Sequence, residues 1–190
     1  MDQEIQVGTG VPELDELLGG GVLRGSTTLL IGPVGSLKSY LGQQFIKLIF
    51  SDIHGLFVEK ALRKMRMEDF EKIEERVVEI FKIIKGGRGL LHSLTPFFYM
   101  LEDEKAIPRF VQVLKARARS YRITLLLTLD RGAQSEYLEE GIKSFCDYVL
   151  ATNVTEGGIR MLRVVKSLTR HDLEWHELLF VEDGVKVQVR

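Results

Sequence analysis

The sequence predicts a domain of the α/β class. Two short apolar runs, residues 26–31 and 123–129, are typical of strands buried on both faces of a sheet. Apolar residues between these runs recur at helical spacing, at Ile107, Phe110, Val111, Leu114 and Ala118. This spacing predicts a helix before the second strand. The resulting order of strand, helix and strand is that of an α/β unit.

A further helix is expected to begin after Gly35, because apolar residues share one helical face there. These residues are Leu37, Leu41, Phe45, Leu48 and Ile49. Residues 62–84 also carry apolar side chains at helical spacing. Their later part, residues 77–84, is β-branched enough to fit a strand, so both interpretations stay open.

The C-terminal part of the chain has a different character. Four runs there are typical of strands, at residues 148–154, 158–165, 174–181 and 185–189. They are separated by turn-forming residues, among them Glu156-Gly157 and Asp183-Gly184. We expect these runs to extend the sheet with antiparallel strands.

Length and charge favour one globular domain covering residues 1–190. The 190 residues carry 26 Lys and Arg against 27 Asp and Glu, a formal net charge of -1, which excludes the global positive field of a freestanding nucleic-acid binder. No apolar run approaches the roughly 18 residues that span a bilayer. The first six residues are polar and acidic, unlike a signal peptide. A cytoplasmic location without membrane contact is expected.

Two rare residues add to this description. The single cysteine, Cys146, cannot form a disulfide within the chain, and a small buried side chain is the favoured interpretation over a nucleophile. Asn153 is the only asparagine, while Glu, Lys and Arg are plentiful. This composition is typical of proteins from very hot environments, and it hints at a thermophilic host.

The most informative stretch lies between a predicted buried strand and a predicted helix. It reads Gly32-Pro33-Val34-Gly35-Ser36-Leu37-Lys38-Ser39. It matches the phosphate-loop pattern G-x-x-x-x-G-K-[ST] at every restricted place except one. In such a loop, backbone N–H groups curl around phosphate oxygens at a helix N-terminus, the Lys supplies positive charge, and the hydroxyl holds Mg²⁺. Lys38 and Ser39 occupy the last two positions.

The exception is Leu37, which stands where the pattern requires its second glycine. That glycine lets the backbone turn freely and approach phosphate closely, so a leucine is expected to strain or crowd the cradle and weaken binding. Two interpretations follow. Either the loop retains binding of ATP or ADP, or it has kept its shape only, with Leu37 joining the apolar face of Leu41 and Phe45.

The sequence around this loop resembles the KaiC-like branch of the RecA superfamily, which includes the archaeal RadA paralogs. The similar segments are residues 9–26, 41–45, 89–96, 124–128, 166–171 and 180–187. The resemblance covers nearly the whole chain. It implies a RecA-like P-loop domain, with a mostly parallel sheet between helices, and often ring or filament assemblies with ATP at subunit interfaces.

The chain departs from this family at positions that carry chemistry. Where the family's Walker B strand ends in Asp-Ser, this chain has His92-Ser93, and an imidazole does not replace the carboxylate that holds the water shell of Mg²⁺. Of the family's paired glutamates that activate water, at most Glu59 matches. The family's Lys-x-Arg finger, which reaches a neighbouring subunit's phosphates, is reduced to Lys166.

These departures predict a regulatory or accessory protein with impaired ATPase chemistry, working with a protein partner or as a homo-oligomer. Mg²⁺ is not expected as a cofactor. The alternatives are an active ATPase in DNA recombination, repair or signalling, in which Asp130 supplies a carboxylate, and a DNA-binding recombinase accessory. The loops that bind DNA in RecA relatives correspond to segments that include residues 102–104 and 131–140, whose net acidic character opposes phosphate binding.

A metal site is not expected either. His171 and His176 lie five residues apart, which does not give the one-face spacing of a helical zinc motif. We interpret both as parts of a polar hairpin.

Overall fold

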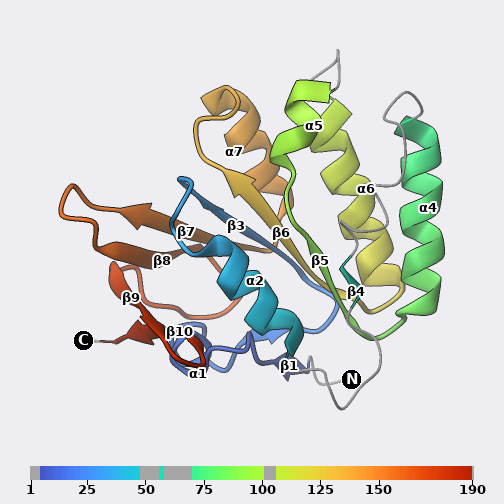
Figure 1. Cartoon of the computed structure of the whole chain (residues 1–190). Coiled ribbons are helices and arrows are strands. Elements are labelled where there is room, and N and C mark those ends of the chain that lie inside the picture. The colour runs from blue at the N-terminus through green and yellow to red at the C-terminus, as the bar shows by residue number, and fades with distance from the viewer. Residues whose placement is uncertain (1–4, 48–55, 58–69, 101–105, 190) are drawn as a thin grey trace.

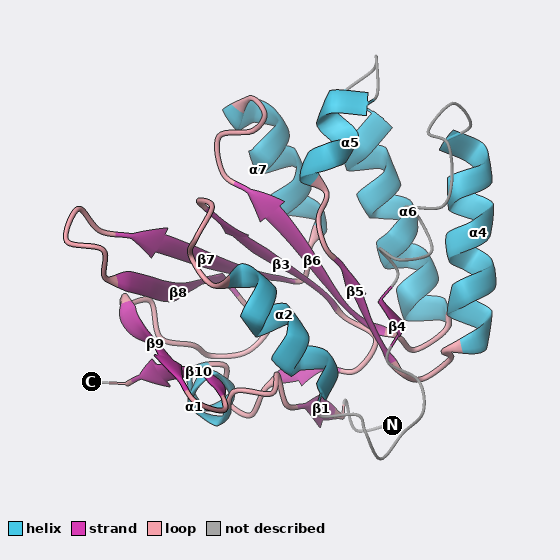
Figure 2. Ribbon diagram, in the orientation of Figure 1, coloured by secondary structure: helices cyan, strands magenta, loops and turns pink. Residues whose placement is uncertain are grey.

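The fold is built on one large β-sheet with helices on both faces (Figures 1 and 2). The computed structural model describes residues 5–47, 56–57, 70–100 and 106–189. The strands of the large sheet are β3 (Thr27–Gly32), β4 (Leu56–Phe57), β5 (Arg88–Leu91), β6 (Thr124–Asp130), β7 (Tyr148–Val154), β8 (Arg160–Lys166), β9 (His176–Val181) and β10 (Gly184–Gln188). Across the sheet they lie in the order β10-β9-β8-β7-β3-β6-β5-β4.

The sheet is parallel in one part and antiparallel in the other. Strands β7, β3, β6, β5 and β4 pair in parallel, and β8, β9 and β10 continue from β7 as antiparallel strands. A separate antiparallel pair is formed by β1 (Gln6–Val7) and β2 (Val22–Leu23). The predicted antiparallel extension at the C-terminal end is therefore confirmed.

Helices cover the two faces of the sheet. They are α1 (Pro12–Leu17), α2 (Lys38–Lys47), α4 (Phe70–Ile83), α5 (Thr95–Met100), α6 (Ala106–Ser120) and α7 (Glu136–Phe145). Buried side chains of α4, α5, α6 and α7 form one apolar cluster with the sheet, while those of α1 and α2 form another. Because successive residues of a strand point to opposite faces, Leu29 and Ile31 of β3 join the first cluster and Leu30 joins the second.

The strand register brings the ends of the central strands together. Gly32, the last residue of β3, pairs with Asp130, the last residue of β6. Leu91, the last residue of β5, pairs with Leu127, which lies three residues before the end of β6. The segments that follow β3 and β5 therefore emerge beside the end of β6, at the carboxyl edge where open α/β sheets bind their ligands.

Most elements agree with the sequence-based expectations. The two central strands, the helix between residues 106 and 120 and the C-terminal strands are confirmed, and the buried side chain of Cys146 is too. Helix α2 is also confirmed, although Leu48 and Ile49 lie outside the described residues. The open choice for residues 77–84 resolves in favour of a helix, because α4 continues to Ile83.

One expectation was wrong. Residues 131–140 were assigned to a loop, but α7 begins at Glu136 and takes up their second half. Ser135 stands at the N-cap position, and Glu136 and Glu139 lie in the first turn, where carboxylates favour the positive end of the helix dipole. The acidic residues there belong to a helix start.

Among the helices that the structure describes, none has the length and apolar character of a membrane-spanning segment.

Candidate functional site: the phosphate loop

The phosphate-loop sequence forms the connection between β3 and α2. Strand β3 ends at Gly32 and α2 begins at Lys38, so the loop leads directly into a helix N-terminus. Gly35 has a φ of 81°, in the left-handed region that favours glycine. From the start of β8, Arg160 donates a hydrogen bond through Nε to the Gly35 carbonyl, 3.0 Å away. The loop is thus braced by the β7–β8 hairpin.

Leu37 has the backbone conformation that glycine would have at this position. Its φ is 69°, in the left-handed region, which costs a residue with a Cβ about 1–2 kcal/mol. The side chain is half-buried and packs against the apolar cluster of α1 and α2. Packing of Leu37 therefore opposes the backbone strain, and the loop keeps the turn that the missing glycine would make without cost.

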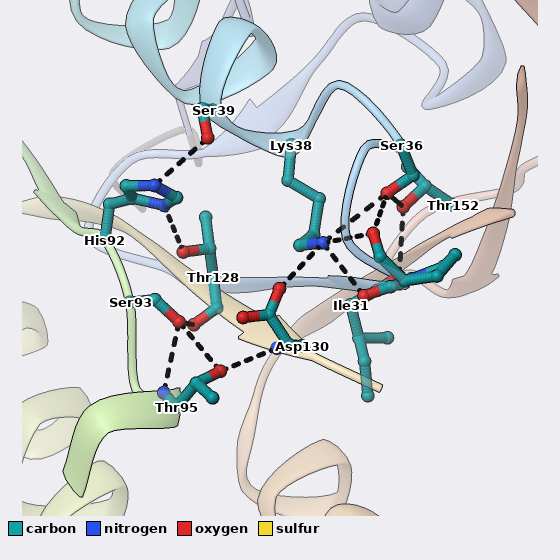
Figure 3. A network of polar contacts seen from close by, with 12 residues as sticks. Ile31, Ser36, Lys38, Ser39, His92, Ser93, Thr95, Thr128, Asp130 and Thr152 are labelled. Atoms are coloured by element: carbon teal, nitrogen blue, oxygen red, sulfur yellow. Dashed lines mark hydrogen bonds and ion pairs between the residues drawn. The ribbon is translucent and has the colours of Figure 1, made fainter. Parts of the chain in front are cut away.

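Lys38 turns back onto its own loop. Its ammonium donates to the carbonyl oxygens of Gly32, at 2.8 Å, and Pro33, at 2.7 Å, and it forms an ion pair with Asp130, with 3.0 Å between Nζ and Oδ1 (Figure 3). The side chain is only 5% exposed. The cation expected to contact phosphate is therefore held inside the loop by three oxygen atoms.

Thr152 of β7 closes the other side of the loop. Its hydroxyl lies 2.7 Å from the hydroxyl of Ser36, which also donates to the Pro33 carbonyl at 2.7 Å. A Cβ added to Gly32 would lie 1.9 Å from the Thr152 hydroxyl oxygen, so no side chain fits there. Thr152 could not be identified from the sequence, because nothing in its local sequence indicates a contact with a loop 116 residues away.

His92 and Ser93 follow β5; His92 faces the start of α2, whereas Ser93 contacts β6 and α5. The Nε2 atom of His92 lies 3.1 Å from the hydroxyl of Ser39, and its Nδ1 lies 2.6 Å from the hydroxyl of Thr128 (Figure 3). Ser93 donates to the Thr128 carbonyl at 3.2 Å, and it accepts a hydrogen bond from the backbone N–H of Thr95 at 3.1 Å. The predicted Walker B position thus meets the last residue of the phosphate loop.

This arrangement does not suit Mg²⁺. The metal is a hard cation that prefers oxygen ligands and usually takes one or two carboxylates together with phosphate oxygens and water. Next to Ser39 the structure places an imidazole nitrogen.

Asp130 is the carboxylate that the fold brings to the loop. Its carboxylate contacts Lys38 directly, and its backbone N–H donates to the Thr95 hydroxyl at 2.9 Å. In the sequence, Asp130 is a candidate only as a substitute for a missing catalytic carboxylate. The contact with Lys38 depends on the pairing of β3 with β6, which a pattern of residues does not contain.

The remaining predicted positions lie elsewhere or outside the described residues. Glu59 is outside them. Lys166, expected to reach a neighbouring subunit's phosphates, donates to the carbonyl oxygens of Cys146, Ser144 and Lys143 at 2.6, 3.0 and 3.4 Å. Its ammonium thus completes the C-terminal end of α7, where a cation complements the helix dipole.

The segment between β6 and α7 is tied down by Glu139. This buried carboxylate accepts hydrogen bonds from the Gly132 backbone N–H at 2.7 Å and from the Gln134 amide at 2.5 Å. The connection is therefore short and held against its own helix.

In the predicted polar hairpin, His176 is buried, with Nε2 3.4 Å from the Asp172 carboxylate.

A strand, a phosphate-loop sequence and a helix at the carboxyl edge of a mainly parallel sheet define a P-loop domain of the RecA type. Comparisons with known proteins agree. The family model for the KaiC ATPase matches residues 7–59. A search of the curated proteins found no match.

Among solved structures, the chain is similar to the KaiC-like protein PH0186 from the hyperthermophilic archaeon Pyrococcus horikoshii OT3. The TM-score is 0.80 with 23% sequence identity, over 98% of this chain and 100% of that one. The chain is thus similar to KaiC-like proteins in two ways: in sequence over residues 7–59, and in its RecA-like fold over nearly its whole length.

Proposed function

We propose that this KaiC-like protein is an impaired ATPase that acts as a regulatory or accessory subunit. In this proposal, its phosphate loop retains weak binding of ATP or ADP but no longer supports hydrolysis that depends on Mg²⁺. The observation that carries the proposal is the hydrogen bond between Ser39 and His92. It pairs the hydroxyl that would hold the metal with an imidazole where the family has a carboxylate.

Retained nucleotide binding is supported by the backbone of the loop. The chain still makes the turn from β3 into α2, with Gly35 and Leu37 both at positive φ. The loop still leads into the N-terminus of α2, and the backbone N–H groups of a helix N-terminus favour anions such as phosphate. Lys38 is also present, although its present partners must be exchanged before it contacts a ligand.

Loss of hydrolysis follows from the requirements of phosphoryl transfer, in which catalysis consists mainly of positioning and charge neutralisation. His92 does not provide the carboxylate that anchors the metal, and Leu37 makes the turn of the loop only with backbone strain. Lys166 is engaged with the end of α7. A reaction that depends on these groups together loses most of its rate when several are missing.

A protein partner is favoured over DNA by charge and by the connection after β6. The net charge is -1. The segment that would have to reach out to DNA is short and hydrogen-bonded to the buried Glu139. We therefore expect such a subunit to bind a protein partner, or a second copy of the chain in a RecA-type assembly.

Equilibrium binding measured by isothermal titration calorimetry tests this proposal. ATP and ADP are titrated into the wild-type protein with Mg²⁺ and with EDTA, and the Lys38→Ala variant serves as the control. We expect weak binding that Mg²⁺ does not strengthen and that Lys38→Ala abolishes. Tight binding that requires Mg²⁺, together with turnover, would contradict the proposal.

A further inference from the structure

We propose that Asp130 is an internal counter-ion of the phosphate loop, which competes with nucleotide phosphates for Lys38 and so sets the affinity of the site. This inference rests on the nucleotide site of the proposed function. It assigns a role to a carboxylate that belongs neither to the phosphate-loop pattern nor to the Walker B position.

The hydrogen-bonding capacity of Lys38 is already filled. An ammonium has three N–H donors, and the three shortest contacts of Nζ are to Pro33 O, Gly32 O and Asp130 Oδ1, at 2.7, 2.8 and 3.0 Å. A fourth contact, to the Ser36 hydroxyl, is longer, at 3.5 Å. A phosphate oxygen can therefore approach the ammonium only if one of these partners leaves.

Asp130 is the partner whose replacement changes the charge of the site. The Gly32 and Pro33 carbonyls belong to the loop itself, whereas Asp130 comes from β6 and carries the negative charge that balances the buried cation. Its side chain is 30% exposed. The carboxylate therefore has solvent into which it can turn when an anion takes its place.

The position of Asp130 is fixed by the framework of the sheet. Its Cα is paired with that of Gly32, the first residue of the loop, in the parallel ladder of β3 and β6. The following residue, Arg131, donates its backbone N–H to the Gly32 carbonyl at 3.0 Å. The Thr95 hydroxyl accepts the N–H of Asp130 at 2.9 Å. The counter-ion is thus held beside the cradle before any ligand arrives.

The exchange favours ligands with several negative charges. A buried ammonium loses a carboxylate partner at a considerable cost unless another anion replaces it. A diphosphate or triphosphate group supplies more charge and more oxygen acceptors than a single carboxylate, and it also contacts the helix N-terminus. We therefore expect the counter-ion to discriminate against nucleoside monophosphates and to lower the affinity for ADP and ATP without abolishing binding.

Neutralising Asp130 tests this inference. Binding of ATP, ADP and AMP to the full chain is measured by calorimetry for wild type and Asp130→Asn, which keeps the shape of the side chain and removes its charge. The control is Glu140→Gln, which removes the same charge from an exposed i,i+3 ion pair with Lys143 on α7. Removing the competing ion pair is expected to tighten binding of ADP and ATP about tenfold, because Lys38 is then no longer paired with an internal carboxylate when the nucleotide binds.

A second measurement follows Lys38 itself. Without the carboxylate, the lysine is expected to react faster with acetic anhydride, as quantified by mass spectrometry of the peptide that contains it, whereas Glu140→Gln leaves this rate unchanged. Thermal unfolding of each variant shows whether the fold is intact. A role of Asp130 in stability alone would change the unfolding temperature but would not tighten nucleotide binding.

The outcomes separate this inference from the function on which it rests. Tighter binding and faster modification in Asp130→Asn, with Glu140→Gln like wild type, support the counter-ion. Equal or weaker nucleotide binding in Asp130→Asn, with binding in wild type, overturns the counter-ion and leaves the nucleotide site standing. Absence of binding in both proteins overturns the nucleotide site and the counter-ion together.

Discussion

The Nε2 atom of His92 lies 3.1 Å from the hydroxyl oxygen of Ser39. The two residues are 53 positions apart in the chain, and the parallel sheet brings them together at one edge. In the KaiC-like family that the sequence resembles, a carboxylate stands at the position of His92. In the proposed function, this contact marks the place where the metal anchor is missing.

Restoring both altered positions is expected to improve nucleotide binding. In the double variant Leu37→Gly with His92→Asp, glycine makes the left-handed turn without strain and aspartate supplies oxygen ligands beside Ser39. We expect the affinity for ATP with Mg²⁺ to rise about tenfold or more, the equivalent of about 1.4 kcal/mol. Calorimetry of the two single variants and the double variant measures the gain.

The two substitutions can be told apart by the metal. The gain from His92→Asp is expected only with Mg²⁺, because the carboxylate acts through the ion, whereas the gain from Leu37→Gly is expected in EDTA as well. An affinity that fails to rise in the double variant would mean that the lost site is not where these residues place it.

Gly32 is predicted to be the most sensitive glycine of the loop. A Cβ there would lie 1.9 Å from the Thr152 hydroxyl oxygen and 2.7 Å from its backbone oxygen, so Gly32→Ala must move backbone as well as side chain. We expect a loss of about 3 kcal/mol or more in the free energy of unfolding, at the upper end of overpacking effects. Urea unfolding followed by circular dichroism measures it.

Gly35→Ala is the matched control in the same loop. No heavy atom lies within 4 Å of a Cβ added there, and only the φ of 81° opposes alanine. The expected cost is about 1 kcal/mol, from the left-handed backbone alone. Equal losses in the two variants would show that Thr152 does not restrict Gly32.

Much of the fold follows from the sequence, because its strands and helices are long enough to carry their own periodicity. Examples are the apolar runs of β3 and β6 and the apolar face of helix α6. Helix α7 was only partly predictable. Ser135 and the acidic residues after it are helix-start signals, but the resemblance to RecA relatives predicts a DNA-binding loop over the same residues.

The contacts of the site were less predictable than its elements. The loop residues and His92 were identified from motifs, which record residue type and spacing. The ion pair of Lys38 with Asp130 and the contact of Ser36 with Thr152 join positions 92 and 116 residues apart. Such contacts depend on strand order and register, and neither is encoded in a local pattern.

Cys146 is predicted to be unreactive in the native protein. Burial raises the pKa of its thiol to about 12, from an ordinary value near 9.0. Since the thiolate is the reactive form, native protein at pH 8 should react with Ellman's reagent only as fast as it unfolds, while protein in 6 M guanidinium chloride reacts at once. Rapid stoichiometric reaction of the native protein would contradict the buried position.

The same shift has a consequence for stability. The folded protein holds the thiol proton more tightly than the unfolded chain, so this contribution is fully present below pH 9. It is lost progressively as the pH rises from about 9 towards 12. Urea unfolding of wild type and Cys146→Ser between pH 8 and pH 11 should show a steeper decline in the wild type.

Lys166 is predicted to stabilise the fold. Lys166→Met keeps the length of the side chain but leaves the carbonyls of Lys143, Ser144 and Cys146 without their donor. We expect a loss of about 1–3 kcal/mol in the free energy of unfolding, measured by urea denaturation. Lys186→Met, at an exposed position of β10, is the control and should change it little. No difference between the two variants would argue against this role.

The most direct test of impaired ATPase chemistry is a single-turnover assay. Wild-type protein in excess over radiolabelled ATP is incubated with Mg²⁺, and released phosphate is compared with that from Lys38→Ala. We predict equal, background release from both proteins. Release that requires Mg²⁺ and disappears in Lys38→Ala would contradict the account and show a working ATPase.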